Sequence, residues 1–356
     1  MGAVDAMRHR GPDGEGVAAF PSGRCVLGHC RLAILDTTDA ASQPMSCPDE
    51  AISIAYNGEC YNHAELRKRL GGNFRSTSDT ETVLHWLKSR WEAGLCDLRG
   101  MFALALWDES RQRLLLARDP LGIKPLYCCP LPAGGIAFAS ELQAMVRAGL
   151  VEAKFDHQAA VHYLAYGFVG EPDSIVAGVK ALPPGTWLEW SARDGRTKTG
   201  QFTSVAEWLE RAAPSDPREL KERFVDAVTS HLISDVPLGA FLSAGVDSSA
   251  LVAAMSAHGA DPRTLTVTFP DSPSTCEGIE AKKWARELGT DHVEVPFSGK
   301  DLLECLAPAL QAQDQPTVDG VNSYVVSTAA KRAGLSVVLS GLGGDELFGG
   351  YPVFED

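Results

Sequence analysis

The chain has 356 residues, of which 45% are hydrophobic and 22% are charged, and it carries a net charge of −14. This length exceeds what one hydrophobic core usually supports, so we expect two domains of ordinary globular composition. The acidity argues against a nucleic-acid partner, because backbone phosphates would be repelled over most of the surface.

The sequence contains no run of about 18 apolar residues that could span a membrane, and its start lacks the pattern of a secretory signal. Its nine cysteines have no metal-ligand spacing, so we expect free thiols in a reducing compartment, without zinc or disulfides. We therefore predict a cytoplasmic protein without a membrane partner.

Short apolar runs separated by turn residues dominate the first 140 residues and indicate strands. These runs cover residues 24–27, 52–56, 102–107, 113–117 and 135–139. Helical patterns interrupt them at 62–70 and 79–93. We therefore expect a strand-rich first domain over residues 1–150.

Turn signals such as Pro183-Pro184-Gly185 mark residues 151–216 as a connecting region. Strands and helices then alternate over residues 217–356. The expected strands are 236–242, 264–269, 292–295 and 335–339, and the expected helices are 248–257, 277–288 and 322–333. Such alternation predicts a parallel sheet with helices on both faces, which binds its ligand at the carboxyl ends of the strands.

One motif of small and hydroxylated residues, Leu242–Ser249, lies between an expected strand and an expected helix. Small residues let backbone N–H groups close around an anion, and the helix N-terminus adds its dipole. The motif lacks the lysine and the spacing of the Walker P-loop, which argues against a kinase or GTPase. A simple helix cap would need only one such residue.

A second motif, Ser340–Tyr351, follows the last expected strand. Its glycines would let a ligand approach the backbone, and Asp345 is suited to hold a metal that bridges phosphates. A Gly-Gly pair alone would more often mark a flexible loop. Two phosphate-type loops at the ends of two strands of one parallel sheet favour a nucleotide site.

These two motifs resemble the N-type ATP pyrophosphatase family and, for Ser340–Tyr351, the asparagine synthetases. The resemblance implies that ATP activates a carboxylate as an acyl-adenylate, that Mg2+ steadies the pyrophosphate, and that ammonia then attacks. It implies that Asp247 and Asp345 hold the metal through pyrophosphate. The implied ATP-binding residues are Leu242, Ser243, Gly245, Val246, Asp247, Ser248, Ser249, Val267, Ser340, Gly341 and Asp345.

The first domain carries five motifs that resemble class II glutamine amidotransferases. These are Arg8–Asp13, Arg31–Asp36, Asn57–Glu59, Thr77–Glu81 and Arg118–Tyr127. The resemblance implies an α+β domain, an αββα sandwich of the N-terminal-nucleophile hydrolase type. The two resemblances together imply that an α/β domain with a doubly wound parallel sheet follows it.

The chemistry of these motif residues suits glutamine. Arg31 can pair with the α-carboxylate in a bidentate fork, while Glu59 and Asp79 can hold the α-ammonium. Asn57 and Gly58 resemble the oxyanion hole of the family, although an Asn-Gly pair is also a strong hairpin signal. We predict that Arg31, Asn57, Glu59 and Asp79 converge on one cleft.

The sequence departs from the family pattern in several places. The nucleophile of the family is a cysteine directly after the initiator methionine, whereas this chain begins Met1-Gly2-Ala3. We therefore expect the first strand, the nucleophile and the C-terminal half of the synthetase domain to lie outside this chain, and the chain alone to be inactive. Ala244 replaces a usual glycine, and Leu342 replaces a frequent acidic residue, which leaves the acceptor carboxylate open.

The leading interpretation is ATP-dependent synthesis of asparagine from aspartate, with ammonia from glutamine hydrolysis. The reaction would pass through a β-aspartyl-adenylate and release AMP and pyrophosphate. The oligomeric state cannot be read from the sequence, and a homodimer is one option. The alternatives are a β-lactam-synthetase-like or other related amidotransferase that acts on another carboxylate, and a non-catalytic nucleotide-binding remnant.

Overall fold

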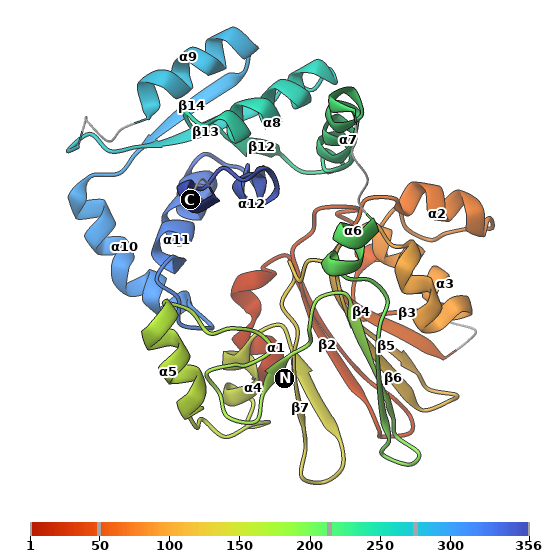
Figure 1. The fold of residues 1–356 in the computed structure, drawn as a ribbon. Helices are drawn as coiled ribbons and strands as arrows, with labels where there is room; N and C mark the ends of the chain where they lie inside the picture. Colours follow the sequence, from red (N-terminus) through yellow and green to blue (C-terminus); the bar gives the residue numbers. More distant parts are fainter. Residues whose placement is uncertain (1, 48–50, 212–215, 273–276, 355–356) are drawn as a thin grey trace. The chain divides into compact units, whose positions relative to one another are not determined.

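The computed structural model describes residues 2–47, 51–211, 216–272 and 277–354. The chain divides into two compact units (Figure 1). Unit 1 comprises Met1–Ala213 and the short segment Asp314–Val318, and unit 2 comprises Pro214–Gln313 and Asp319–Asp356. Within the described residues, no helix has both the length and the apolar character that crossing a bilayer requires.

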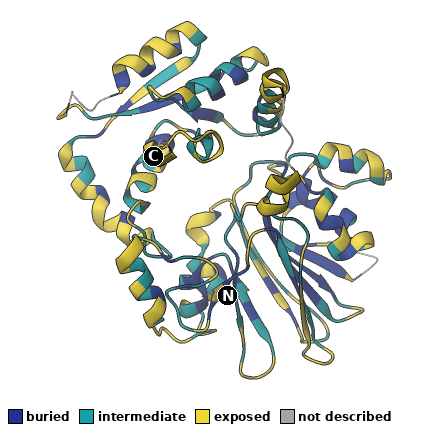
Figure 2. Cartoon of the chain, viewed as in Figure 1, coloured by how far each residue is buried: buried dark blue, intermediate teal, exposed yellow. Residues whose placement is uncertain are grey.

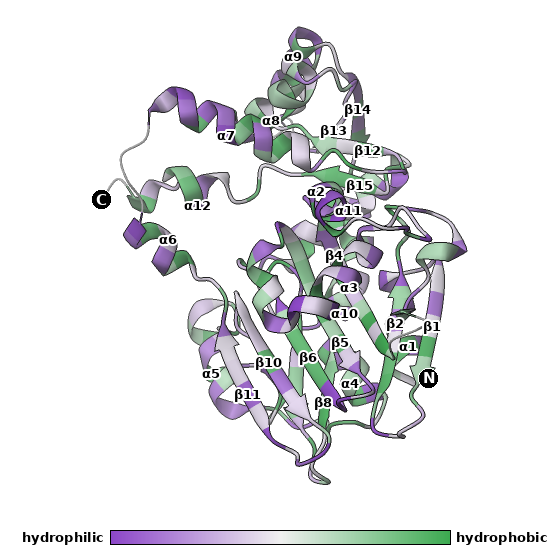
Figure 3. Cartoon of the chain, turned by 90° about the vertical axis from the view of Figure 1, so that its right-hand side faces the viewer, coloured by the Kyte–Doolittle hydropathy of each residue, from purple (hydrophilic) through white to green (hydrophobic). Residues whose placement is uncertain are grey.

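Unit 1 is built on a sheet of six antiparallel strands in the order β11-β10-β6-β5-β4-β3. These strands are β3 (Met45–Cys47), β4 (Ile52–Cys60), β5 (Gly100–Asp108), β6 (Arg113–Arg118), β10 (Thr186–Ser191) and β11 (Thr197–Gln201). The inner strands β5 and β6 are hydrophobic along most of their length, whereas the edge strand β11 is hydrophilic (Figure 3).

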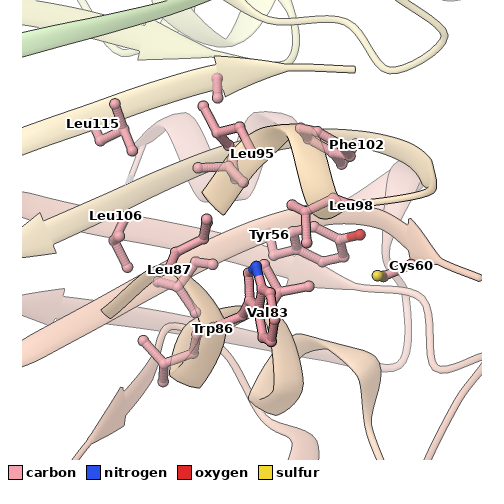
Figure 4. Packing of buried hydrophobic residues seen from close by; sticks show 14 of the residues in the cluster. Tyr56, Cys60, Val83, Trp86, Leu87, Leu95, Leu98, Phe102, Leu106 and Leu115 are labelled. Atoms are coloured by element: carbon pink, nitrogen blue, oxygen red, sulfur yellow. The ribbon is translucent and has the colours of Figure 1, made fainter. Parts of the chain in front are cut away.

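Both faces of this sheet are buried. Phe102 and Leu106 of β5 pack with Trp86 of helix α3 (Asp79–Arg90) in one hydrophobic cluster (Figure 4). Ala103 and Trp107, which alternate with them along β5, belong to a second cluster on the opposite face. The helix α2 (His63–Leu70) lies beside α3, and a 3-10 segment, η3 (Trp91–Asp97), follows α3.

A second layer of strands completes the sandwich. It consists of the hairpin of β1 (Gly14–Ala19) and β2 (Val26–Arg31) and of a three-stranded sheet formed by β7 (Tyr127–Pro130), β8 (Ile136–Ala139) and β9 (Lys180–Ala181). Leu27 of β2 packs in the same cluster as Trp107. The short helix α4 (Leu142–Arg147) packs on the outer side of β8, next to α1 (Gly2–Ala6). The predicted αββα arrangement is confirmed.

Residues 151–211, where the sequence indicated a connecting region, are part of unit 1. Strand β10 pairs with β6, with Leu188 opposite Leu116, and β11 extends the sheet beyond it. The helices α5 (His157–Tyr166) and α6 (Val205–Arg211) lie in the same stretch. The segment Asp314–Val318 also joins unit 1, because the Asp314 carboxylate accepts hydrogen bonds from the backbone N–H groups of Leu142 and Gln143 at 2.7 and 2.9 Å.

Unit 2 contains a parallel sheet of four strands in the order β14-β13-β12-β15. The strands are β12 (Leu238–Phe241), β13 (Arg263–Thr268), β14 (Asp291–Pro296) and β15 (Val337–Leu339). The helices are α7 (Pro217–Ser230), α8 (Val246–Ala257), α9 (Gly278–Leu288), α10 (Gly299–Ala312), α11 (Gly320–Arg332) and α12 (Gly344–Phe348). Short 3-10 segments elsewhere in the chain are η1 (Arg8–Arg10), η2 (Asp39–Ala41) and η5 (Pro352–Phe354).

Helices cover both faces of the parallel sheet. The first three helices pack in one cluster with Ala240 and Leu242, and α10 and α11 pack in another with Leu265 and Val295. The buried residues line the sheet side of the helices, while the outer sides are exposed (Figure 2). The predicted doubly wound α/β arrangement is confirmed. The strand order reverses direction between β12 and β15, and ligands bind at such a switch point in open α/β sheets.

Candidate active sites

A cavity of about 360 Å³ lies in unit 1 and is lined by residues of β2, β4 and the loops around them. Its lining includes all of the residues that the sequence suggested for glutamine, namely Arg31, Asn57, Gly58, Glu59 and Asp79. These residues are scattered over almost fifty positions of the sequence. The prediction that they converge on one cleft is therefore confirmed.

The Asn57-Gly58 pair lies inside strand β4 and does not form a hairpin turn, because it pairs with Ala103 and Phe102 of β5. A Cβ atom at position 58 would lie 2.2 Å from the carbonyl oxygen of Met101. Glycine is required here by the close approach of the two strands. The Asn57 Nδ2 atom lies 3.5 Å from the hydroxyl of Ser140, at the edge of the cavity.

Arg31 ends strand β2 and is held by the loop that follows it. Its Nη1 donates to the carbonyl oxygen of Thr38 at 2.8 Å, and its Nη2 donates to the carbonyl oxygen of Asp36. A guanidinium has five N–H donors, so donors remain for a planar anion in the cavity.

The carboxyl groups of Glu59 and Asp79 lie on one side of the cavity, where positive charge does not fully compensate for their burial. Burial raises the pKa of Asp79 to about 6, although the N–H groups of Cys60 and Thr80 each donate to its carboxylate at 2.8 Å and oppose this rise. Burial and the charge of Asp79 raise the pKa of Glu59 to about 7, against the opposing effect of Lys124. Burial in turn lowers the pKa of Lys124. This arrangement favours the binding of a small cation.

Sequence reasoning missed several residues that line the cavity. His29 lies two positions before Arg31, on the same face of β2, and that spacing was the available signal. Its Nε2 donates to the carbonyl oxygen of Tyr56 at 3.1 Å, and burial lowers its pKa to about 4, so the ring is neutral at pH 7. Lys124 and Arg10 each belong to a motif that the sequence had marked without assigning them a role.

A second cavity of about 390 Å³ shares the wall formed by His29, Tyr56 and Asn57 with the first. The rest of its lining is mostly apolar and comes from β2, β5 and β8. A charged ligand would lose its hydration there without compensating partners, so the polar first cavity is the better site for an amino acid.

In unit 2, the loop Leu242–Gly245 follows β12, and Val246–Ser249 form the first turn of α8. The hydroxyls of Ser243 and Ser248 lie 2.8 Å apart, and the N–H of Gly245 donates to the Ser243 hydroxyl at 3.1 Å. These bonds close the loop on itself and hold it at the N-terminus of α8. Ala244 does not have a positive φ angle, so alanine in place of glycine adds no backbone strain there.

The loop after β15 touches the loop after β12. A Cβ atom at Gly341 would lie 3.1 Å from the Cβ atom of Asp247, and a Cβ atom at Gly344 would lie 2.2 Å from its Oδ2. A side chain at position 344 would displace the Asp247 carboxylate, which occupies that space. The two loops that the sequence predicted at the ends of two strands of one parallel sheet therefore lie against each other at its carboxyl edge. Val267 lies on β13, the strand beside β12.

Asp247 and Asp345 are the acidic side chains where these loops meet, because Asp345 follows Gly344 directly. Neither carboxylate accepts a hydrogen bond from the part of the chain that the structure describes. Within that part, no three acidic, histidine or cysteine side chains form a ready-made metal cluster. Two carboxylates with free acceptor positions suit a hydrated Mg2+ that takes its remaining ligands from phosphates.

Comparisons with known proteins agree with the division of the chain into two units. Residues 1–202 match the family model of the glutamine amidotransferase domain, and residues 219–356 match that of asparagine synthase. The chain is 34% identical over 353 residues to asparagine synthetase [glutamine-hydrolyzing] 1 of Bacillus subtilis (strain 168), covering 98% of this chain and 55% of that protein. It is 33% identical over 369 residues to asparagine synthetase B [glutamine-hydrolyzing] of Escherichia coli (strain K12), covering 98% of this chain and 60% of that protein.

The chain thus spans little more than half the length of these relatives. Among solved structures, the glutamine phosphoribosylpyrophosphate amidotransferase from B. subtilis matches with a TM-score of 0.41 and 17% identity over 95% of this chain and 77% of that chain, a likeness too distant to add to the assignment. Residues 1–202 of the chain therefore belong to the glutamine amidotransferase domain family, and residues 219–356 match the asparagine synthase family.

Proposed function

We propose that this protein takes part in the ATP-dependent synthesis of asparagine from aspartate, with ammonia released from glutamine in unit 1. Unit 2 would activate aspartate as a β-aspartyl-adenylate and release AMP and pyrophosphate. The observation that carries this proposal is the convergence of Arg31, Asn57, Glu59 and Asp79 on one cavity. The meeting of two phosphate-type loops at the switch point of the parallel sheet supports it.

In the cavity of unit 1, Arg31, Glu59 and Asp79 would bind the two charged groups of glutamine. Arg31 would donate to the α-carboxylate, and Glu59 and Asp79 would receive the α-ammonium. Asn57 and Gly58 would face the side-chain amide, where donors stabilise the negative oxygen that develops during hydrolysis. The raised pKa values of Glu59 and Asp79 support the ammonium assignment, because a bound cation would compensate for the burial of both carboxylates.

In unit 2, the loop Leu242–Gly245 and the first turn of α8 would bind the phosphates of ATP. The backbone N–H groups at the start of this helix of 12 residues provide the donors for an anion. Asp247 and Asp345 would hold Mg2+, which when bound would neutralise part of the pyrophosphate charge. Their position on two touching loops supports this role, as does the lack of a hydrogen-bond donor to either carboxylate among the described residues.

A second candidate is a related ligase that activates another carboxylate. The observation behind it is Leu342, which is 86% exposed in the loop after β15, at a position where the sequence departs from the family pattern that the resemblance implies. The convergence of the glutamine-type residues supports the asparagine proposal over a relative that no longer uses glutamine. Assaying the complete protein with aspartate and with a panel of other carboxylates separates the two.

The glutamine site can be tested by proton release on binding. In the free protein the pKa values of Glu59 and Asp79 are raised to about 7 and about 6, so both carboxyls are partly protonated near pH 6.5. A bound ammonium lowers both pKa values, so glutamine binding is expected to release protons at pH 6.5 and almost none at pH 8.5. Calorimetric titrations in buffers with different ionisation enthalpies measure this release.

Replacing Glu59 by glutamine is expected to remove most of the proton release and to weaken glutamine binding about 10- to 100-fold, since a charged hydrogen bond is lost. The matched control is Glu65→Gln on α2, because the side chain of Glu65 is 69% exposed and does not line the cavity. Unchanged proton release in the Glu59 variant would contradict the assignment. A wild-type protein that binds no glutamine at millimolar concentration would also contradict the assignment.

A further inference from the structure

We propose that Asp36 is a positioning residue for glutamine: it ties the loop that holds Arg31 to the loop that leads to Asp79. It would thereby fix the spacing between the group that binds the α-carboxylate and the group that binds the α-ammonium. This inference rests on the proposed glutamine site. Asp36 does not line the cavity and therefore acts through its neighbours.

On the arginine side, the backbone from Asp36 to Thr38 supports the guanidinium. The carbonyl oxygens of both residues accept hydrogen bonds from Arg31. The Asp36 carboxylate holds this backbone in place, because its Oδ1 accepts from the Thr38 N–H at 3.1 Å and from the Thr38 hydroxyl at 2.6 Å. The orientation of Arg31 thus depends on the conformation of a loop that the Asp36 side chain closes.

On the acidic side, Oδ2 of the same carboxylate accepts from the backbone N–H of Thr77 at 2.7 Å. Thr77 stands directly before Ser78, the cap of α3, and Asp79 is the first residue of that helix. Arg67 holds the other side of the same segment through the carbonyl oxygen of Ser78 at 2.7 Å. The approach to α3, and with it the Asp79 carboxylate, is therefore fixed between Asp36 and Arg67.

The hydrogen bond between Thr77 and Asp36 joins two residues that are 41 positions apart in the sequence. No local structure therefore fixes the distance between the two loops. Asp36 is 6% exposed and has a φ angle of 56°, a left-handed conformation that aspartate adopts more readily than most residues. Burial acts to raise its pKa, but the hydrogen bonds from Thr38 and Thr77 outweigh burial and lower it. The carboxylate is therefore ionised at pH 7 and accepts on both oxygens at once.

The test replaces Asp36 by asparagine in the full chain and measures ligand binding by calorimetry. The amide can still accept from Thr38, but its NH2 group meets the Thr77 N–H, so the link between the loops is lost. Three ligands are compared, namely glutamine, glutamine with its α-carboxylate replaced by an amide, and 4-carbamoylbutanoate, which lacks the α-amine. Only glutamine needs both ends of the site at the correct spacing.

Glutamine affinity is expected to fall about 10- to 100-fold in Asp36→Asn, while the affinities of the two single-ended ligands change by less than about threefold. Hydrogen exchange at the Thr77 N–H should rise in the same variant, as its acceptor is lost. Asp39→Asn is the matched control, because Asp39 is exposed in the same loop. It should bind all three ligands like the wild type.

Thr38→Val serves as a second variant if Asp36→Asn does not fold, because it deletes the 2.6 Å bond to Oδ1, together with the bond that the hydroxyl accepts from the Ala40 N–H at 3.3 Å, and keeps the Asp36–Thr77 bond. It should weaken the binding of glutamine and of 4-carbamoylbutanoate by several-fold, because both use Arg31, and leave the binding of the ligand without the α-carboxylate unchanged. Equal loss for all three ligands would overturn the positioning role, as would unchanged glutamine affinity in a folded Asp36→Asn. If the wild type itself binds no glutamine, the proposed function fails, which is a separate outcome.

Discussion

Replacing Asp247 or Asp345 by asparagine is expected to lower ATP–pyrophosphate exchange by about 10²- to 10³-fold in the complete protein, and to leave glutamine hydrolysis unchanged. Asparagine keeps the size and one oxygen of aspartate but removes the negative charge that Mg2+ requires beside a pyrophosphate. Because Asp247 lies against Gly344, next to Asp345, both substitutions remove charge from one place. Incorporation of labelled pyrophosphate into ATP measures the first activity, and glutamate release measures the second.

Glutamine hydrolysis is expected to survive because unit 1 has hydrophobic clusters of its own. The matched control is Glu346→Gln, since Glu346 is the next residue after Asp345, is exposed, and accepts a hydrogen bond from the hydroxyl of Tyr351 at 2.8 Å. It should change pyrophosphate exchange by less than about twofold. Wild-type exchange in either aspartate variant would remove the metal-binding role, and thermal unfolding checks that each variant is folded.

Much of the fold could be predicted from local patterns, because periodicity reports which side of an element is buried. The run 102–107 was predicted as a strand and lies within β5, and the pattern at 79–93 was predicted as a helix and contains α3. The alternation of strands and helices after residue 217 predicted the parallel sheet, and both phosphate-type loops were found at the carboxyl ends of β12 and β15. These are features that neighbouring residues determine.

What could not be predicted depends on residues far apart in the sequence. Strand β10 is partly buried only because it pairs with β6, more than sixty positions earlier, and nothing within Thr186–Ser191 indicates that partner. The helix α10 was missed, and it contains Pro308, which lacks an N–H and normally argues against a helix interior. Lys124 was missed as a site residue because only the folded cavity brings it beside Glu59.

The Asn57-Gly58 pair illustrates how a strong local signal can mislead. An Asn-Gly pair usually indicates a two-residue hairpin turn. Here it continues a strand of nine residues, because the backbone of β5 comes so close at Gly58 that no Cβ atom would fit. The glycine is explained by the packing of two strands and not by a turn, which only the strand pairing could reveal.

Replacing Arg118 by methionine is expected to destabilise unit 1 by about 3–5 kcal/mol, since three carbonyl oxygens lose the buried guanidinium that donates to them. Arg118 is 4% exposed. Its guanidinium donates to both carboxylate oxygens of Glu171 at 2.8 and 2.9 Å, and to the carbonyl oxygens of Gly122, Lys124 and Leu182 at 2.7, 2.8 and 2.9 Å. The Glu171 side chain is 41% exposed and can be rehydrated, but buried carbonyl oxygens would lose their donor without replacement.

Urea unfolding followed through tryptophan fluorescence measures the loss, because Trp86 and Trp107 are fully buried in unit 1. Arg111→Met is the matched control, since Arg111 is 64% exposed and lies 3.6 Å from Asp108, and an exposed pair of this kind contributes at most about 1 kcal/mol. A loss below about 1 kcal/mol in Arg118→Met would show that water replaces the guanidinium. Arg118 also holds the loop that carries Lys124 to the cavity. The affinity of folded Arg118→Met for glutamine should therefore fall, whereas Arg111→Met should bind glutamine like the wild type.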